Sequence, residues 1–229
     1  MKYKAIIFDM DGTIINSEHI WRRATKELIE SKTNEPACPK FLEELESELK
    51  GLELNASCSI IKSKLGLHHE VHHLAAEKKE RALNLFREGI EFIEGFVNFH
   101  GRVLEENLKF GIATNADDNT LEAAIMALEL KALFGDHIYN ITHVNGIHKP
   151  NPDLYLHVAE QLGIKPEECV AIEDSAHGVK AAVDAGMFCI GINTAKDEKF
   201  LQESHLIINH YDDICLKRLL KKKNADELK

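Results

Sequence analysis

Residues 5–13 read Ala-Ile-Ile-Phe-Asp-Met-Asp-Gly-Thr, an apolar run that ends in two aspartates on alternate positions. A short, wholly apolar run is typical of a strand buried on both faces of a parallel sheet. Carboxylates that follow it lie where the strand leaves the sheet, which is where open α/β sheets bind ligands. Residues two apart on a strand share a face, so Asp9 and Asp11 point the same way if the backbone stays extended. We therefore expect a reaction centre here, although Asp and Gly are also favoured in ordinary surface turns.

Short apolar runs recur after residue 95 and alternate with segments of helical periodicity. Helical patterns extend over residues 120–130, 152–162 and 178–185. Strands that alternate with helices form βα units, in which the strands are parallel. The chain is therefore predicted to have an α/β fold. The apolar runs that we expect to form the later strands are residues 110–114, 169–173, 188–192 and 206–208.

Residues 16–92 have a different composition, rich in Glu, Lys, Leu and Ala, and their apolar positions recur at helical spacings. Two prolines, Pro36 and Pro39, divide this block into an early helix and a later one, and Gly51 and Gly66 suggest further boundaries. Because the first strand has no partner strand in the first hundred residues, the block is expected to be an insertion. We predict a core formed by residues 1–15 and 93–229, and a helical domain formed by residues 16–92.

The composition limits the classes of partner. The 229 residues carry a formal net charge of −10, and 44% of them are hydrophobic, which supports a sizeable core. The negative charge argues against a nucleic-acid or anionic-membrane surface, because both require clustered positive charge. Five cysteines without a C-x-x-C pair suggest neither a disulfide framework nor a zinc site. We see no signal peptide and no apolar stretch of bilayer length, so a cytoplasmic protein is expected.

Polar side chains also follow the later strands. Thr114 and Asn115 offer a hydroxyl, an amide and backbone N–H groups that suit phosphate oxygens. Lys149 lies in a segment stiffened by two prolines, just before a predicted helix, and Glu173 and Asp174 form a second acidic pair at a strand end. Each has an ordinary alternative, because Thr, Asn and Asp cap helices and most lysines are solvated. Because polar residues follow several of the predicted strands, and not just one, we interpret them together as a site.

An oxygen-rich group of Asp9, Glu173 and Asp174 suits Mg²⁺, a hard cation that is held by carboxylates, water and substrate phosphate. The cation and Lys149, helped by the polar pair at 114–115, would neutralise a phosphoryl group. The sequence therefore predicts a magnesium-assisted site for a phosphorylated substrate.

The two aspartates of the first motif then have different roles. With the phosphoryl charge neutralised, Asp9 can attack phosphorus in line and form an aspartyl-phosphate, which divides one difficult transfer into two easier steps. Asp11 would protonate the leaving oxygen and later take a proton from water. This chemistry is that of a phosphoryl-transfer enzyme.

In this order, the motifs resemble the four motifs of the haloacid dehalogenase-like hydrolase superfamily. The helical block resembles the cap of the subgroup that includes β-phosphoglucomutases and sugar-phosphate phosphatases, and the match extends from Ala5 to about Ile192. The resemblance implies a Rossmann-like parallel-sheet core, an inserted α-helical cap domain that closes over substrate, and Mg²⁺ as cofactor. It also implies that Asp9 is the nucleophile, and that Asp11 is the acid/base with its backbone carbonyl on the metal.

Members of this superfamily differ in the reaction that they catalyse. Dehalogenating members lack the second aspartate of the first motif, so Asp11 points to phosphoryl transfer. Lys50 is the candidate for the Schiff-base lysine of phosphonate-cleaving members, but mutases resemble the chain at the same lysine-glycine turn. The mutase has an arginine where this chain has Leu54, and a cap histidine where it has Trp21.

We therefore expect a phosphomonoesterase for a small phosphorylated metabolite such as a sugar phosphate, as a monomer or small homo-oligomer. The enzymatic alternative is a phosphosugar mutase of the β-phosphoglucomutase type. The non-enzymatic alternative is a catalytically inactive protein that binds a phosphometabolite or a partner.

Overall fold

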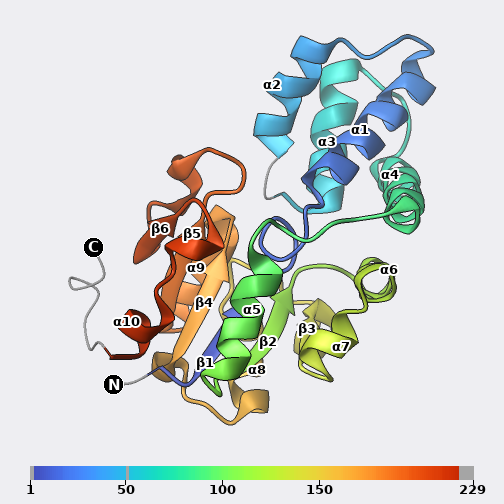
Figure 1. The fold of residues 1–229 in the computed structure, drawn as a ribbon. Coiled ribbons are helices and arrows are strands. Elements are labelled where there is room, and N and C mark those ends of the chain that lie inside the picture. The colour runs from blue at the N-terminus through green and yellow to red at the C-terminus, as the bar shows by residue number, and fades with distance from the viewer. Residues whose placement is uncertain (1–2, 50–51, 222–229) are drawn as a thin grey trace. The chain divides into compact units, whose positions relative to one another are not determined.

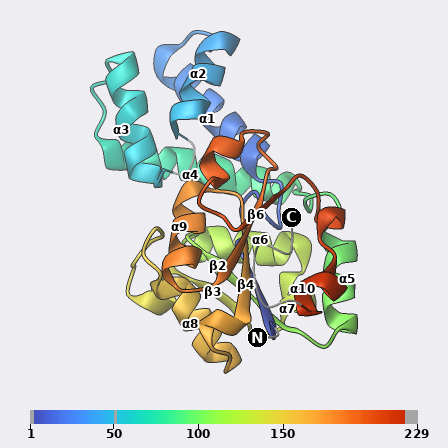
Figure 2. The same cartoon turned by 90° about the vertical axis from the view of Figure 1, so that its left-hand side faces the viewer.

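The computed structural model describes residues 3–49 and 52–221, and it divides into two compact units. The sheet unit comprises the described residues up to Asn16 together with those from Glu91 onward. The helical unit is Ser17–Ile90. Figures 1 and 2 show the elements of both units. Lys50 lies outside the described residues, so its interpretation as a Schiff-base lysine stays a prediction.

Within the described residues, the centre of the sheet unit is a parallel sheet of six strands. The strand order is β3-β2-β1-β4-β5-β6, so the first strand of the chain lies in the middle of the sheet (Figure 1). This arrangement confirms the predicted α/β fold with a Rossmann-like parallel core. The strands are β1 (Ala5–Phe8), β2 (Lys109–Thr114), β3 (Ile138–Asn140), β4 (Cys169–Glu173), β5 (Phe188–Ile192) and β6 (Leu206–Ile208).

The apolar runs of the sequence correspond to β1, β2, β4, β5 and β6, whereas β3 has no such run. That strand has three residues, the last of which is the polar Asn140. It pairs with β2 through Ile112 opposite Ile138, at the edge of the sheet. A strand this short has no periodicity of its own, and its partner determines where it forms.

Helices follow most of the strands and return the chain to the next one. The helices of the sheet unit are α5 (Phe96–Glu105), α6 (Asp118–Leu128), α7 (Leu130–Phe134), α8 (Asp153–Leu162), α9 (Ala176–Asp184) and α10 (Leu216–Lys221), with short 3₁₀ turns η1 (Ile141–Val144), η2 (Pro166–Glu168), η3 (Glu198–Leu201) and η4 (Tyr211–Asp213).

Helices cover both faces of the sheet (Figures 1 and 2), and different buried side chains form the core on each face. Ala5 and Ile7 of β1 join the buried apolar side chains of α8 and α9 on one face. Phe8 turns to the other face, where its ring makes edge contacts with Phe96 of α5 and Phe134 of α7. Because successive side chains on a strand point to opposite faces, a buried central strand must be apolar throughout. Burying each such side chain contributes roughly 1.5–3 kcal/mol.

The helical unit consists of four helices over its described residues. Pro39 is the first residue of α2, where its missing N–H costs no hydrogen bond. Leu28, Cys58 and Leu74 are fully buried and hold three of the helices together. Across the described residues, none of the helices is both long enough and apolar enough to cross a lipid bilayer. The four helices are α1 (Glu18–Thr33), α2 (Pro39–Leu49), α3 (Leu54–Leu65) and α4 (Val71–Glu88).

Candidate active site

The first acidic residue lies at the exit of β1. The Asp9 backbone N–H donates to the Ile172 carbonyl at 3.0 Å, so pairing with β4 continues one residue beyond the strand. The Met10 carbonyl then accepts from the N–H groups of Ile14 and Ile15, which closes a tight turn. Strand β1 thus ends one residue before Asp9, and Asp11 lies within the turn, so a shared direction of the two side chains stays a prediction. Asp9 is buried whereas Asp11 is half-buried.

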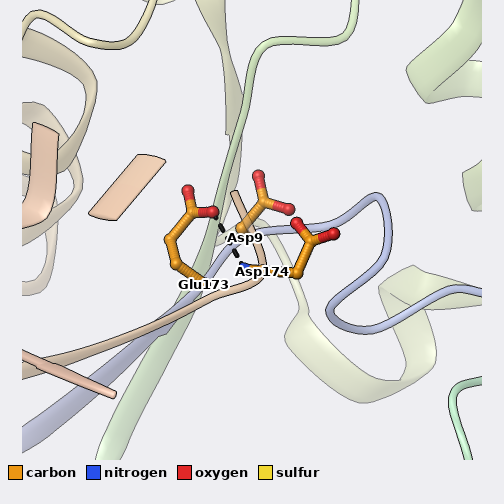
Figure 3. Close-up of side chains that lie close together, drawn as sticks. All are labelled: Asp9, Glu173 and Asp174. Carbon is orange, nitrogen blue, oxygen red and sulfur yellow. Dashed lines mark hydrogen bonds between the residues drawn. The ribbon is translucent and has the colours of Figure 1, made fainter. Parts of the chain in front are cut away.

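Three carboxyl groups meet at the adjoining ends of β1 and β4. Phe8 lies opposite Ile172 in the parallel register, so the next residues, Asp9 and Glu173, are neighbours. Asp9, Glu173 and Asp174 each offer an oxygen within 4.8 Å of the others, and their carboxyl groups project to the same side (Figure 3). An all-oxygen set of carboxylates fits a hard divalent cation such as Mg²⁺.

Lys149 is the cation of this cluster. Its Nζ donates to Asp9 Oδ1 at 2.6 Å, to Glu173 Oε1 at 2.6 Å and to the Ala113 carbonyl at 2.8 Å. An ammonium group has three N–H bonds, so these acceptors take all of them. Burial alone lowers the pKa of Lys149, but the Asp9 and Glu173 carboxylates outweigh it and raise the pKa above its ordinary value. Lys149 is therefore a fixed positive charge.

The surroundings of Asp9 disfavour its charged form. Burial, and after it the charge of Glu173, raise the pKa of Asp9 to about 7, although the Lys149 ammonium acts in the other direction. Both pKa values are raised because two buried carboxylates share one ammonium group: the shift favours the charged form of Lys149 but the neutral form of Asp9. Lys149 keeps its proton, and the negative charge left over makes a second cation favourable at this point.

Glu173 is fully buried and both of its oxygens are bonded. Oε1 accepts from Lys149 and from the Tyr155 hydroxyl, at 2.8 Å for the latter. Oε2 accepts from the Asp174 backbone N–H at 3.2 Å and from the Ser175 hydroxyl at 3.1 Å. Ser175 is also the N-cap of α9, where it accepts from the Gly178 N–H. The carboxylate thus lies at a helix N-terminus, which favours negative charge.

Two glycines allow the carboxylates of Glu173 and Asp174 to approach the backbone. A Cβ atom on Gly178 would lie 1.7 Å from Glu173 Oε1, and one on Gly12 would lie 2.2 Å from Asp174 Oδ2. Gly12 also has φ +78°, a conformation that other residues rarely adopt. Close packing of backbone and carboxylate therefore determines the residue type at both positions.

Thr114 and Asn115 hold the loops around Lys149. Asn115 Oδ1 accepts from the Lys149 backbone N–H at 3.0 Å, and Thr114 Oγ1 accepts from the Ala116 N–H at 3.1 Å. Thr114 is buried and Asn115 is half-buried. Of the predicted site residues, the structure thus brings Asp9, Lys149, Glu173 and Asp174 together and ties Asn115 to the lysine. Phosphate binding by Thr114 and Asn115 stays a prediction.

Sequence reasoning misses Tyr155 and Thr194. Tyr155 belongs to the buried stripe of α8, where its spacing is that of an ordinary core residue. Thr194 follows β5, and its hydroxyl donates to the Gly12 carbonyl at 2.8 Å. The position of Thr194 after a strand is a usable signal. Nothing in the pattern of α8 indicates that one core side chain carries a hydroxyl bonded to Glu173.

The parallel sheet, the inserted helical unit and the acidic group at the strand ends agree with one known family. The chain belongs to the haloacid dehalogenase-like hydrolase family, whose model matches residues 6–192. This match confirms the resemblance inferred from the motifs.

Three similar proteins illustrate the relationship. Fructose-1-phosphate phosphatase from Escherichia coli (strain K12) is 28% identical over 200 residues, which cover 83% of this chain and 97% of that protein. Protein SUPPRESSOR OF QUENCHING 1, chloroplastic, from Arabidopsis thaliana is 30% identical over 210 residues, which are 89% of this chain but only 19% of that protein. The crystal structure of β-phosphoglucomutase from Clostridium difficile has the same fold, with a TM-score of 0.75 over 94% of both chains and 22% identity.

The contact between Gly178 and Glu173 predicts a stability difference between two helical glycines. Gly178→Ala places a methyl group where the carboxylate lies, and overpacking of this kind costs about 1–3 kcal/mol. Gly101→Ala is the matched control, because it lies in α5 and the added Cβ meets nothing within 4 Å apart from the backbone of its own helix and its chain neighbours. It should be neutral or stabilising by about 0.5–1 kcal/mol. Urea unfolding of both variants measures the difference, and equal midpoints would contradict it.

Removal of the Lys149 ammonium group should strongly lower the stability of the fold. Lys149→Met leaves Asp9 and Glu173 buried without their ammonium partner, and such a change costs about 3–5 kcal/mol. Lys180→Met, which removes an exposed partner of Asp184 on α9, should change stability little. The test is urea unfolding at pH 7 in the presence of EDTA. A Lys149→Met variant as stable as Lys180→Met would show that the charge cluster is not the constraint described above.

Proposed function

We propose that this protein is a Mg²⁺-dependent phosphomonoesterase that hydrolyses a small phosphorylated metabolite, a sugar phosphate, through an aspartyl-phosphate on Asp9. The observation that carries the proposal is the arrangement at the ends of β1 and β4. There, a buried carboxylate is held by Lys149 at 2.6 Å and lies next to two further carboxylates. Family membership and a relative named as a fructose-1-phosphate phosphatase support the same activity.

The donor set fits a hard divalent cation. Asp9, Glu173 and Asp174 would hold Mg²⁺ together with the backbone carbonyl of Asp11, and the bound ion would supply positive charge against the phosphoryl oxygens. Lys149 adds a fixed positive charge from the protein itself. Phosphate contacts by Thr114 and Asn115 complete the proposed site.

In the first step, a carboxylate oxygen of Asp9 attacks phosphorus, and the bond from phosphorus to the alcohol oxygen of the substrate breaks. Asp11 gives its proton to that oxygen, so the product alcohol leaves neutral. Lys149 remains protonated throughout, because it is hydrogen-bonded to two carboxylates. Asp9 now carries the phosphoryl group as a mixed anhydride.

In the second step, water attacks phosphorus, and Asp11 takes the proton that the water loses. The bond between phosphorus and the Asp9 oxygen breaks, which releases inorganic phosphate and restores the carboxylate. One proton enters and leaves Asp11 in each cycle. The reaction is therefore balanced without a further reactant besides water.

The helical unit favours a phosphatase over a mutase. The two positions at which a mutase carries a histidine and an arginine are Trp21 and Leu54. Trp21 packs its ring edge-to-face on Phe86 at 6.4 Å, and Leu54 packs against the buried cluster of Leu28, Cys58 and Leu74. Both side chains are used for packing, and neither carries the positive charge that would hold a second phosphate. A bisphosphate intermediate would lack these two contacts.

Removal of either aspartate of the first motif should abolish or greatly slow turnover. Asp9→Asn lacks the attacking carboxylate, and we expect no turnover of p-nitrophenyl phosphate or of a panel of phosphometabolites in Mg²⁺. Asp11→Asn should lose about 10² to 10⁴-fold, the usual contribution of a general acid and base. Asp184→Asn, on the exposed surface of α9, is the control and should keep full activity.

The outcomes separate the three candidate functions. A wild-type protein without turnover of any substrate, and without trapping of beryllium fluoride at Asp9, supports the inactive binding protein instead. Conversion of β-glucose 1-phosphate to glucose 6-phosphate faster than phosphate release establishes the mutase. Full activity of Asp9→Asn would falsify the proposed nucleophile.

Mg²⁺ binding should depend on pH near neutrality. Because the pKa of Asp9 is raised to about 7, a proton competes with the metal below that pH, and the affinity should fall about tenfold per unit as the pH drops further. Above pH 7 the carboxylate is ionised and the affinity should level off. Isothermal titration calorimetry from pH 5.5 to 8.5 measures this, and Asp9→Asn should remove the dependence. A constant affinity over this range would contradict the assignment of Asp9 as a ligand.

A further inference from the structure

Tyr155 lies next to the Lys149 and Glu173 pair but has no role in the two proposed steps. Its side chain is fully buried, and its hydroxyl is 2.8 Å from Glu173 Oε1. Lys149 Nζ lies 3.5 Å from the same hydroxyl and 4.9 Å from the centre of the ring. The tyrosine is therefore in contact with both members of the pair.

The direction of the hydroxyl proton follows from its neighbours. An ammonium group offers only hydrogens, whereas an ionised carboxylate only accepts. The Tyr155 hydroxyl must therefore donate to Glu173 and turn its lone pairs towards Lys149. Burial, with the charge of Glu173 next, raises the pKa of Tyr155 well above its ordinary value, so the proton stays on the tyrosine.

This second donor changes how Glu173 shares Lys149 with Asp9. Glu173 Oε1 accepts both from Tyr155 and from Lys149, whereas Asp9 Oδ1 accepts from Lys149. A carboxylate oxygen that already holds one hydrogen bond attracts the next donor less strongly. Without the tyrosine hydroxyl, Glu173 would draw the ammonium group away from Asp9.

We propose that Tyr155 is a positioning residue, whose hydroxyl satisfies Glu173 and so keeps the Lys149 ammonium directed at Asp9 and at the phosphoryl group that Asp9 receives. This inference rests on the proposed function. The residue is well placed for the task because it lies on α8, a helix packed against the central strands. Side chains held on a rigid element keep a geometry more precisely than those on a loop.

The competing interpretation is that Tyr155 only fills the core. Tyr155→Phe separates the two, because it keeps the ring and its packing and removes the hydroxyl alone. Both interpretations allow a loss of stability, since a buried carboxylate loses a hydrogen bond. Only the positioning role changes the state of Lys149 and the rate of the chemical steps in folded protein.

The first measurement is steady-state hydrolysis of p-nitrophenyl phosphate in Mg²⁺, at a temperature where the variants are fully folded. We expect Tyr155→Phe to lower kcat about tenfold and to leave KM within a factor of two, because the misplaced charge matters most in the transition state. Tyr139→Phe is the control. It removes the hydroxyl of a tyrosine on edge strand β3, where the contact is His137, and it should keep both constants.

The second measurement needs no metal and no turnover. The ¹⁵Nζ resonance of Lys149, identified by its absence in Lys149→Met, should shift in metal-free Tyr155→Phe and stay unchanged in Tyr139→Phe. Tyr155→Phe with a wild-type kcat and an unmoved Lys149 signal would overturn the inference and leave Tyr155 as a core residue. If wild-type protein hydrolyses no substrate, the proposed function fails and the positioning role fails with it.

Discussion

The active-site end of the sheet depends on one ammonium group that two buried carboxylates share. Lys149 bonds to Asp9 and Glu173 at 2.6 Å each, and a third N–H goes to the Ala113 carbonyl. These acceptors lie directly after β1, at the end of β4 and in β2, which are three neighbouring strands. Because each charge would be costly to bury alone, the strands, the loop before α8 and the charges must assemble together.

This constraint explains why the surroundings are so closely packed. The buried Glu173 carboxylate accepts hydrogen bonds from the Tyr155 hydroxyl, from the Ser175 hydroxyl and from the backbone N–H of Asp174, just before α9. Gly178 and Gly12 leave room for the carboxylates because they have no side chains. A site built in this way cannot relax around a misplaced charge. Such preorganisation is what electrostatic catalysis requires.

How far the sequence predicts this arrangement depends on whether the signal is local. A wholly apolar run can only be a buried strand or helix, so β1 and β4 are visible in the sequence, and the carboxylates after them follow from topology. The three-residue strand β3 is not visible, because its partner strand β2 decides where it forms. The turn after Met10 is local, and Gly12 is the signal for it in the sequence. The Tyr155 contact is hidden for another reason: its helix has the periodicity of any amphipathic helix. The roles of the site residues are chemical and stay predictions, since geometry alone does not test them.

The net charge of the carboxylate cluster determines how it can bind the proposed substrate. When ionised, Asp9, Glu173 and Asp174 carry three negative charges against the single positive charge of Lys149, in a chain whose net charge is −10. A phosphate dianion would be repelled from such a site, because like charges in a poorly solvated place interact strongly. A bound divalent cation would remove the excess of two negative charges, so that the charge of Lys149 would act on the phosphoryl oxygens of the proposed substrate. Metal binding and substrate binding should therefore reinforce each other, and a protein without the cation should bind phosphate weakly even with every side chain in place.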